Sequence, residues 1–375
     1  MDPWPIFKYY NVENYTGMVF TADKKLEVIC DRIGFTVARR ILSFKHGVTA
    51  SSQNEFISKL AAAMRSKPSI ESAIDSFWKD LLLGGERLAH LHKVKTEDIA
   101  KLDKALKRES KRATNNPFQN LYPYPLNSKK LGTVDTNFHV MDLSSYSSPD
   151  NNSDLTVAVI CSKASYTTTE PIEQEYLSKK GVSLLGDTEI ICRRRNVTQC
   201  FDLIIYDKNS DFVLVAADAS VLTSSIESRN QLEKLKGYIR TELSMDLVFD
   251  RPSNVFPAIP NLYERKDGRI SLLAFVTSDG NPSTLRAKAF KVQCLRADAY
   301  HKGGESKARV LNKYKLGKQW VIPIEENLNV APGLEINGIR KMAEGGVDPL
   351  YHFKLLNCFS LKQTMFTVDK LVAAL

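Results

Sequence analysis

The stretch from 200 to 243 decides the fold: it reads CFDLIIYDKNSDFVLVAADAS over 200–220 and SIESRNQLEKLKGYIRTEL over 225–243. Apolar, β-branched runs flank the polar cluster Asp207–Ser210, which predicts a hairpin. The second segment predicts an amphipathic helix packed on that hairpin, because its apolar residues recur at spacings of three and four: Leu232, Leu235, Ile239 and Leu243. Upstream, IEQEYLSKKG (172–181) predicts a helix and TEIICRRR (188–195) a strand.

Composition places the chain among ordinary globular proteins. Of its 375 residues, 43% are hydrophobic and 25% charged, and its formal net charge is +9. A positive balance of this size favours an anionic partner such as nucleic acid. No apolar run reaches the roughly 18 residues of a membrane helix, so no membrane partner is expected. The chain contains no GxxxxGK[ST], GxGxxG or GxSxG motif.

An intracellular location, cytoplasmic or nuclear, is the expectation from both the first residues and the cysteines. MDPWPIFKYYNVENY lacks the basic and apolar regions of a signal peptide. The cysteines are scattered without a CxxC pair, as expected of reduced thiols: Cys30, Cys161, Cys192, Cys200, Cys294 and Cys358.

Residues 1–116 predict an all-helical domain. Apolar stripes at helical spacing run through 26–41, 56–64 and 74–81, and Gly84-Gly85 can end the third. Ser52 and Glu55 form a capping-box pattern, and Ser69 is placed to cap the next helix. A further helix begins near Thr96. The histidines at 90 and 92 follow a helix and are expected at the surface.

Residues 117–130 are rich in Pro and Asn and predict a linker. Strand patterns dominate 131–375, so the fold class is α+β: a helical N-terminal domain followed by a larger domain with a mixed or antiparallel sheet. Asp267-Gly268 and Asp279-Gly280 are expected hairpin turns, and NLYER (261–265) an expected strand. The second domain would hold the unit at 172–243 and a basic strand region at 286–322.

The unit at 172–243 resembles the core of the PD-(D/E)XK nuclease superfamily, in which a helix, a three-stranded meander and a second helix carry metal-binding carboxylates. The resemblance is architectural and covers about a fifth of the chain. It implies Glu173 or Glu175 on the leading helix, with Glu175 as the candidate, and Asp202 in the strand FDLIIY and Asp218 at the end of VLVAADAS as the other catalytic residues. Ala216 stands where the family has its second acid and Asp218 where it has lysine, so the resemblance is to a degenerate core.

Two basic regions are candidate nucleic-acid sites, since lysine and arginine neutralise phosphates. The first is the end of the helix after Thr96; besides Lys101 and Lys107 it carries Lys104, Arg108, Lys111 and Arg112. The alternative is a solvated helix face. Arg193-Arg194-Arg195 adds charge beside the central hairpin, where strand alternation points Arg194 away from its neighbours.

The second region contains ten basic residues against only Asp298 and Glu305: Arg286, Lys288, Lys291, Arg296, Lys302, Lys307, Arg309, Lys313, Lys315 and Lys318. Phe290, Tyr300, Tyr314 and Trp320 are interleaved and could stack on bases. His301–Gly304 is expected to be a loop whose amides approach a phosphate. The alternative is a basic sheet edge that discourages strand pairing with other molecules.

The sequence therefore predicts a nucleic-acid-binding protein that uses a basic C-terminal sheet surface on a nuclease-like scaffold without catalysis and without a cofactor. One alternative is an active nuclease, in which Glu175, Asp202 and Asp218 hold Mg²⁺ or Mn²⁺. Another is an assembly protein whose basic face meets an acidic protein partner or a second copy of the chain. DNA or RNA are equally compatible with the sequence.

Overall fold

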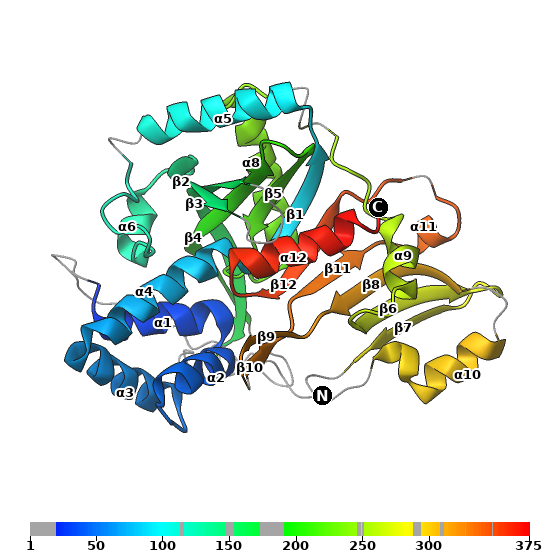
Figure 1. Cartoon of the computed structure of the whole chain (residues 1–375), viewed down its shortest axis with the longest axis horizontal. Coiled ribbons are helices and arrows are strands. Elements are labelled where there is room, and N and C mark those ends of the chain that lie inside the picture. Colours follow the sequence, from blue (N-terminus) through cyan, green and yellow to red (C-terminus); the bar gives the residue numbers. More distant parts are fainter. Residues whose placement is uncertain are drawn as a thin grey trace, which may run out of the picture.

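A computed structural model describes residues 20–112, 116–147, 154–172, 191–245, 249, 251–287, 294–307, 311–326, 328–346 and 348–375. Within these residues the frame is a ten-stranded sheet with the order β2-β3-β4-β5-β1-β12-β11-β8-β6-β7 (Figure 1). Neighbouring strands in it pair antiparallel. This confirms the α+β class. Of the two predicted kinds of sheet, mixed or antiparallel, the described sheet is antiparallel.

The strands of the large sheet are β1 (Gly85–Lys93), β2 (His139–Ser147), β3 (Asp154–Pro171), β4 (Ile191–Asp207), β5 (Phe212–Asp218), β6 (Arg269–Thr277), β7 (Pro282–Arg286), β8 (Leu311–Gln319), β11 (Gly333–Asn337) and β12 (His352–Cys358). A separate small sheet pairs β9 (Ile322–Glu325) with β10 (Leu328–Val330).

The helices are α1 (Ala22–Ile33), α2 (Phe35–His46), α3 (Gln53–Ser66), α4 (Pro68–Leu83), α5 (Thr96–Lys111), α6 (Ser128–Thr133), α8 (Ser225–Thr241), α9 (Ala258–Glu264), α10 (Ala299–Lys307), α11 (Arg340–Ala343) and α12 (Leu361–Val372). None of the helices in the described residues combines the length and apolar character needed to cross a bilayer.

The predicted cap at Ser52 forms, and α8 begins with a capping box that was not predicted. The Ser52 side chain accepts a hydrogen bond from the Glu55 amide at the start of α3. Ser224 and Glu227 form a complete capping box on α8. The prediction of Ser69 as a cap is wrong, because α4 begins one residue earlier at Pro68. Proline suits this first helical position, where its missing N–H costs no intrahelical bond.

Hydrophobic side chains fill both faces of the half of the sheet that contains β1 to β5. One core lies between the sheet and α1–α4 and includes Leu203, Leu214 and Ala216. The other lies between the sheet and the pair α5 and α8, and includes Ile204 and Val215. Strand residues alternate between the two faces, so the continuous apolar runs of β4 and β5 are those of strands buried on both sides.

The prediction that 1–116 is helical throughout is wrong for one segment. Residues 85–93 form β1, which lies inside the sheet between β5 and β12. His90 and His92 lie on this strand and are 3% and 0% exposed, so their expected place at the surface is also wrong. The polar residues in GERLAHLHK make this strand hard to predict from sequence. They are buried by β5 and β12, which come from distant parts of the sequence.

The predicted linker at 117–130 packs into the core. Its apolar residues alternate with the prolines and are buried: Phe118, Leu121, Tyr124 and Leu126. The Trp78 indole donates a 2.8 Å hydrogen bond to the Pro123 carbonyl. A Pro-rich composition therefore marks irregular backbone here and does not mark an exposed connection.

Several local predictions changed in the second half of the chain. The strands predicted at 188–195 and 200–206 are one strand, β4, over the residues the structure describes. NLYER belongs mostly to helix α9, and His301–Gly304 lies inside α10, so neither the strand nor the phosphate-binding loop forms. The turn at Asp279-Gly280 does join β6 to β7, whereas Asp267-Gly268 connects α9 to β6. The helix predicted at 172–181 lies outside the described residues from 173 onward.

Candidate functional site

The structure places the two aspartates of the nuclease-like core on opposite faces of the sheet. Asp202 lies on β4 and shares its face with Ile204, toward α8. Asp218 ends β5 on the face of Ala216, toward α1. Both side chains are 0% exposed. The third predicted residue, Glu175, lies outside the described residues.

Asp218 forms a buried ion pair with Arg32 of α1. The Arg32 guanidinium donates two hydrogen bonds to the carboxylate, at 2.9 and 3.2 Å. The amides of Phe201 and Ser220 donate two more, at 3.0 and 3.1 Å. Burial alone would raise the pKa of Asp218, but the charges of Arg32 and Arg87 and these hydrogen bonds hold its pKa below the usual value.

No lysine or arginine among the described residues forms an ion pair with Asp202. Its carboxylate accepts hydrogen bonds from the Asp218 amide at 2.8 Å and from the Gln231 side chain at 2.6 Å. Burial raises the pKa of Asp202 to about 7, and the neighbouring charge of Asp218 adds to the rise. Gln231 also donates to the Ser162 hydroxyl, which ties α8 to β3 and β4.

Arg87 on β1 is also 0% exposed, and it bonds backbone carbonyls. Its guanidinium donates to the carbonyl oxygens of Gly84, Phe201 and Leu82. Burial lowers the pKa of Arg87 to about 10, so it stays charged at neutral pH. Arg87 therefore links its own strand β1 to the end of α4 and to β4. Sequence reasoning missed Arg32 and Arg87, because nothing local to either residue indicates a partner so far away in the chain.

This buried network suits packing better than metal chemistry. Metal-dependent phosphodiester cleavage needs carboxylates gathered on one side of the metal, and here the two lie across a sheet, with Arg32 bonded to one of them. Among the described residues there is no group of three His, Cys, Asp or Glu side chains placed to hold a metal ion. Should Mg²⁺ or Mn²⁺ bind at Asp202 or Asp218, it would first have to displace these hydrogen bonds.

The basic end of α5 is largely neutralised by acids on the same helix. Lys101 pairs with Asp98 and Lys107 with Asp103, both at 2.8 Å. Arg108 and Arg112 both pair with Glu109, at 3.0 and 3.1 Å. Lys104 and Lys111 are exposed. This region therefore resembles the solvated helix face more than a phosphate-binding surface.

The C-terminal basic residues do not gather on one surface in the part of the chain that the structure describes. Lys318 is 1% exposed and bonds the carbonyls of Leu262 and Arg265 and the carboxylate of Asp267. Arg296 likewise bonds backbone carbonyls beside α9. The exposed members are Arg286 on β7 and Lys302 and Lys307 on α10. Lys288, Lys291 and Arg309 lie outside the described residues.

A β-bulge separates the two remaining lysines of this region. Lys315 lies opposite Ala274, and Lys313 lies opposite Phe275. Because consecutive residues of a strand point to opposite faces and opposed residues share a face, Lys313 and Lys315 lie on different faces of the sheet. The Lys313 ammonium packs 4.1 Å from the centre of the Tyr263 ring.

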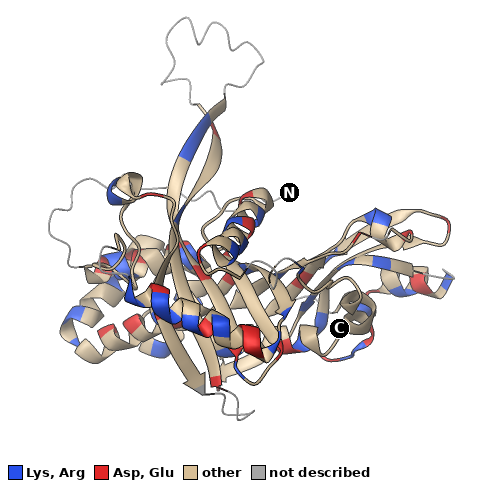
Figure 2. Ribbon diagram, turned by 90° about the horizontal axis from the view of Figure 1, so that it is seen from above, with Lys and Arg blue, Asp and Glu red and all other residues tan. Residues whose placement is uncertain are grey.

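A further set of exposed cations lies on a two-stranded extension of the sheet, which we call the ribbon: residues 163–171 of β3 and 191–199 of β4. β2 pairs with β3 only as far as Cys161, and β5 pairs with β4 only over 203–206. Beyond these points β3 and β4 pair with each other, up to Pro171 opposite Ile191. Figure 2 shows the ribbon projecting from the body of the molecule, with basic residues on it.

Arg193, Arg194 and Arg195 lie on the ribbon and are exposed. They face Thr169, Thr168 and Thr167 on the other strand. No carboxylate among the described residues forms an ion pair with any of the three. The Arg195 guanidinium reaches the Ser165 hydroxyl at 3.5 Å. The sequence contained this signal as a run of three arginines. What it did not show is that, among the residues the structure describes, no third strand pairs with the ribbon.

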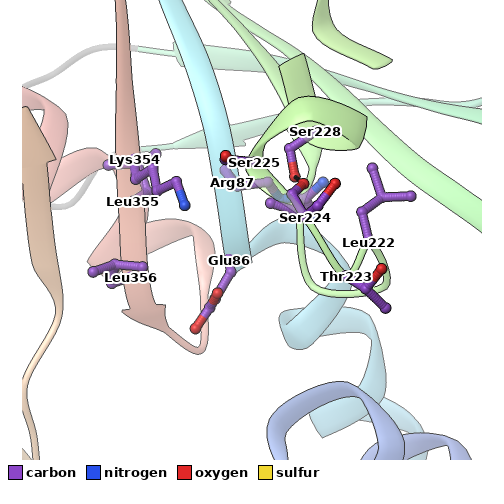
Figure 3. A pocket seen from close by; sticks show the side chains of 11 residues that line it. Glu86, Arg87, Leu222, Thr223, Ser224, Ser225, Ser228, Lys354, Leu355 and Leu356 are labelled. Carbon is purple, nitrogen blue, oxygen red and sulfur yellow. Dashed lines mark hydrogen bonds between the residues drawn. The ribbon is translucent and has the colours of Figure 1, made fainter. Parts of the chain in front are cut away.

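A small cavity of about 160 Å³ lies beside the start of α8, between Glu86 and Arg87 on β1 and Lys354 on β12 (Figure 3). Three backbone amides at this helix start have side-chain partners. Ser224 accepts from the Glu227 amide, and the Glu227 carboxylate accepts from the amides of Thr223 and Ser224. The Glu227 carboxylate therefore already occupies the amides of Thr223 and Ser224 at this end of the helix.

Comparisons with known proteins leave the site to be judged on its geometry alone. No protein-family model, curated protein or solved structure matches this chain.

Proposed function

We propose that this protein binds nucleic acid, and that the ribbon carries the contact. The observation that supports this is the set of three exposed arginines on the ribbon, where among the described residues β3 and β4 pair only with each other. Three adjacent cations repel one another, and phosphate oxygens would remove that repulsion while accepting bidentate hydrogen bonds from each guanidinium. The threonines opposite can donate hydroxyl hydrogen bonds to phosphates.

The remaining charge agrees with this assignment. Asp202 and Asp218 are buried beside the equally buried cations Arg32 and Arg87, so this network contributes little net charge to the field outside the protein. The net charge of +9 then attracts a polyanion and accelerates its association. The C-terminal cations Arg286, Lys302 and Lys307 add to this attraction without forming a site of their own. An intracellular location, where nucleic acid and reduced cysteines both occur, is part of the proposal.

The test is a titration of the purified chain against labelled single- and double-stranded DNA and RNA at about 50 and 200 mM salt, with and without Mg²⁺ or Mn²⁺. We expect salt-dependent binding. The triple change Arg193→Gln, Arg194→Gln and Arg195→Gln should lower the slope of log K against log salt by up to about 2.7 units on duplex, at about 0.9 per contact. The matched control changes Lys67, Lys79 and Lys362, all exposed, to Gln.

Two outcomes would count against the proposal. If no nucleic acid binds at either salt concentration, an acidic protein partner becomes the better explanation of the arginines. If the ribbon variant and the control weaken binding equally, binding depends on net charge alone and the ribbon has no special part. Cleavage that requires Mg²⁺ or Mn²⁺ and disappears in Asp202→Ala would restore the nuclease alternative.

A further inference from the structure

We infer that a nucleic-acid duplex lies on one side of the ribbon, in the angle between α6 and the inner half of the ribbon, and is held there by one sugar–phosphate backbone. The inference rests on the proposed function and deepens it. The inner half comprises residues 163–167 of β3 and 195–199 of β4, which pair with each other. The cations that contact the phosphates are Arg195 on β4 and Lys129 and Lys130 on α6, all exposed.

Strand alternation assigns each side chain of the ribbon to one of its two sides. In the body of the sheet, Phe201 of β4 faces the core that contains α1–α4, whereas Ile204 faces the core that contains α8. The pairing of β3 with β4 runs on into the ribbon without a shift in register. Arg195 therefore points to the same side as Phe201, and Arg194 points to the side of α8.

Helix α6 lies on the same side of the ribbon as Arg195. The Gln199 side chain points to that side and accepts a 2.9 Å hydrogen bond from the amide of Leu126, just before α6 begins. Lys163 lies opposite Gln199 and points to the same side. Its ammonium donates to two carbonyls at the end of α6, those of residues 132 and 134. Both ends of α6 are thus tied to the base of the ribbon, and its exposed lysines lie beside it.

The α8 side of the ribbon suits phosphates less well, because acids lie at it. The start of α8 lies along the outer edge of β3, where the Glu227 carboxylate accepts a 2.8 Å hydrogen bond from the Thr167 amide. Glu170 lies opposite Cys192, so it shares the side of Arg194 and is its diagonal neighbour. A phosphate backbone on this side would meet these carboxylates.

The spacing of the cations on the α6 side fits one strand of a duplex. Arg195 lies about 14 Å from Gln199 along β4, at about 3.4 Å per residue. Each strand of a duplex carries one phosphate per roughly 3.4 Å of helix axis, so contacts at Arg195 and at α6 fall about four phosphates apart. The acid that follows α6, Asp135, is already engaged, since its carboxylate accepts two hydrogen bonds from Asn137.

The side chains of this surface favour a duplex that is bound without regard to sequence. Proteins that hold single strands stack the bases on aromatic side chains, and α6 (SKKLGT) contains none. Nor is any aromatic among the inner-half residues that point to the α6 side: Lys163, Ser165, Thr167, Arg195, Val197 and Gln199. A duplex also offers more charge, one per about 1.7 Å of axis. Contacts to phosphates position the duplex and carry no sequence information.

The first experiment removes the lysines of α6. Binding of duplex DNA and of duplex RNA is measured over a salt series for the pair Lys129→Gln with Lys130→Gln. The matched control is Lys67→Gln with Lys362→Gln, which removes the same charge from exposed positions elsewhere. We expect the slope of log K against log salt to fall by up to about 1.8 units for the α6 pair, at about 0.9 per contact, and to change little in the control.

Equal slopes for these two pairs would place α6 outside the contact and overturn the inference. The proposed function is judged separately, by the triple change of the ribbon arginines, and could still hold. A lack of binding to any nucleic acid at low salt would overturn the proposed function and the inference with it. Thermal unfolding of each variant checks that the exposed substitutions leave the fold intact.

The second experiment compares the two sides of the ribbon at single positions. Arg195→Gln should lower the salt slope on duplex by about 0.9, whereas Arg194→Gln should behave like the control Lys67→Gln. If Arg194→Gln lowers the slope as much as Arg195→Gln does, nucleic acid contacts both sides. The one-sided contact is then wrong, although the proposed function stands.

The third experiment identifies the class of nucleic acid by competition. Labelled duplex bound to the wild-type chain is displaced by unlabelled duplexes of unrelated sequence and by single strands of the same length. We expect the duplexes to compete equally and the single strands to compete less well. A single strand that competes better than its duplex would contradict the inference, and so would a preference of about a thousandfold for one sequence, the lower end of the range for specific binding.

Discussion

Replacing Arg32 by methionine tests the buried ion pair that joins α1 to the end of β5. The variant leaves Asp218 as an unpaired charge at a position with 0% exposure. Two charge-assisted hydrogen bonds are lost, each worth about 1.5–3 kcal/mol. The two backbone amides that remain bonded to the carboxylate limit the loss. We therefore expect the free energy of unfolding to fall by about 3–5 kcal/mol, the range for breaking a buried pair.

Urea unfolding followed by tryptophan fluorescence and circular dichroism measures this loss, and Trp78 beside Arg32 gives a local probe. Arg65→Met is the matched control. Its pair with Asp23 has the same 2.9 Å separation, but the side chains are 59% and 43% exposed, so its loss should stay below about 1 kcal/mol.

A second change separates an unpaired charge from a packing defect. In the double variant Arg32→Met with Asp218→Asn the buried charge is gone, so part of the lost stability should return. If Arg32→Met costs no more than Arg65→Met, or if the double variant is as unstable as the sum of the two single ones, the ion pair does not hold the helical layer to the sheet.

Burial lowers the pKa of His90 to about 4 and of His92 to about 3, so below about pH 6.5 the unfolded chain binds protons that the folded one refuses. The free energy of unfolding therefore decreases as the pH is lowered. In urea unfolding, the His92→Phe variant should lose about 2 kcal/mol less of this free energy than the wild type between pH 7 and pH 5. Gly84→Ala should destabilise by about 1–3 kcal/mol, because its Cβ would meet backbone atoms at 2.5 Å; Gly237→Ala, with open space around it in α8, should stabilise by about 0.5–1 kcal/mol in the same assay. In limited proteolysis, 116–126 should resist early cleavage because it packs in the core, and an early cut there would support a two-domain division at this point.

The parts of the fold predicted from sequence are those that local chemistry specifies. The turn at Asp207–Ser210, the Ser52 cap of α3 and the start of α5 at Thr96 each depend on residues within one or two turns of chain, and all three form. β1 escaped prediction because its burial comes from β5 and β12, far along the chain. A segment with arginine and two histidines reads as surface until both neighbours are known.

The candidate site was predicted less well, for a related reason. That Asp202 and Asp218 lie on different faces depends on where each strand begins within the sheet, and a shift by one residue would reverse it. Likewise, the bulge in β8 places Lys313 and Lys315 on different faces of the sheet, although they are two residues apart on one strand. The three ribbon arginines could be recognised in the sequence. The sequence did not indicate that their strands extend beyond the rest of the sheet.

The position of β1 has a consequence for how the chain folds. Its partner residues His90 and His352 are roughly 260 positions apart, so the middle of the sheet closes only through a very long loop. Contacts of this kind slow folding, since the chain entropy is lost before the strands gain from pairing. During synthesis one side of β1 has no neighbour until β12 leaves the ribosome. An early strand of this kind is open to pairing with other chains, and we expect it to make rapid refolding at high protein concentration prone to aggregation.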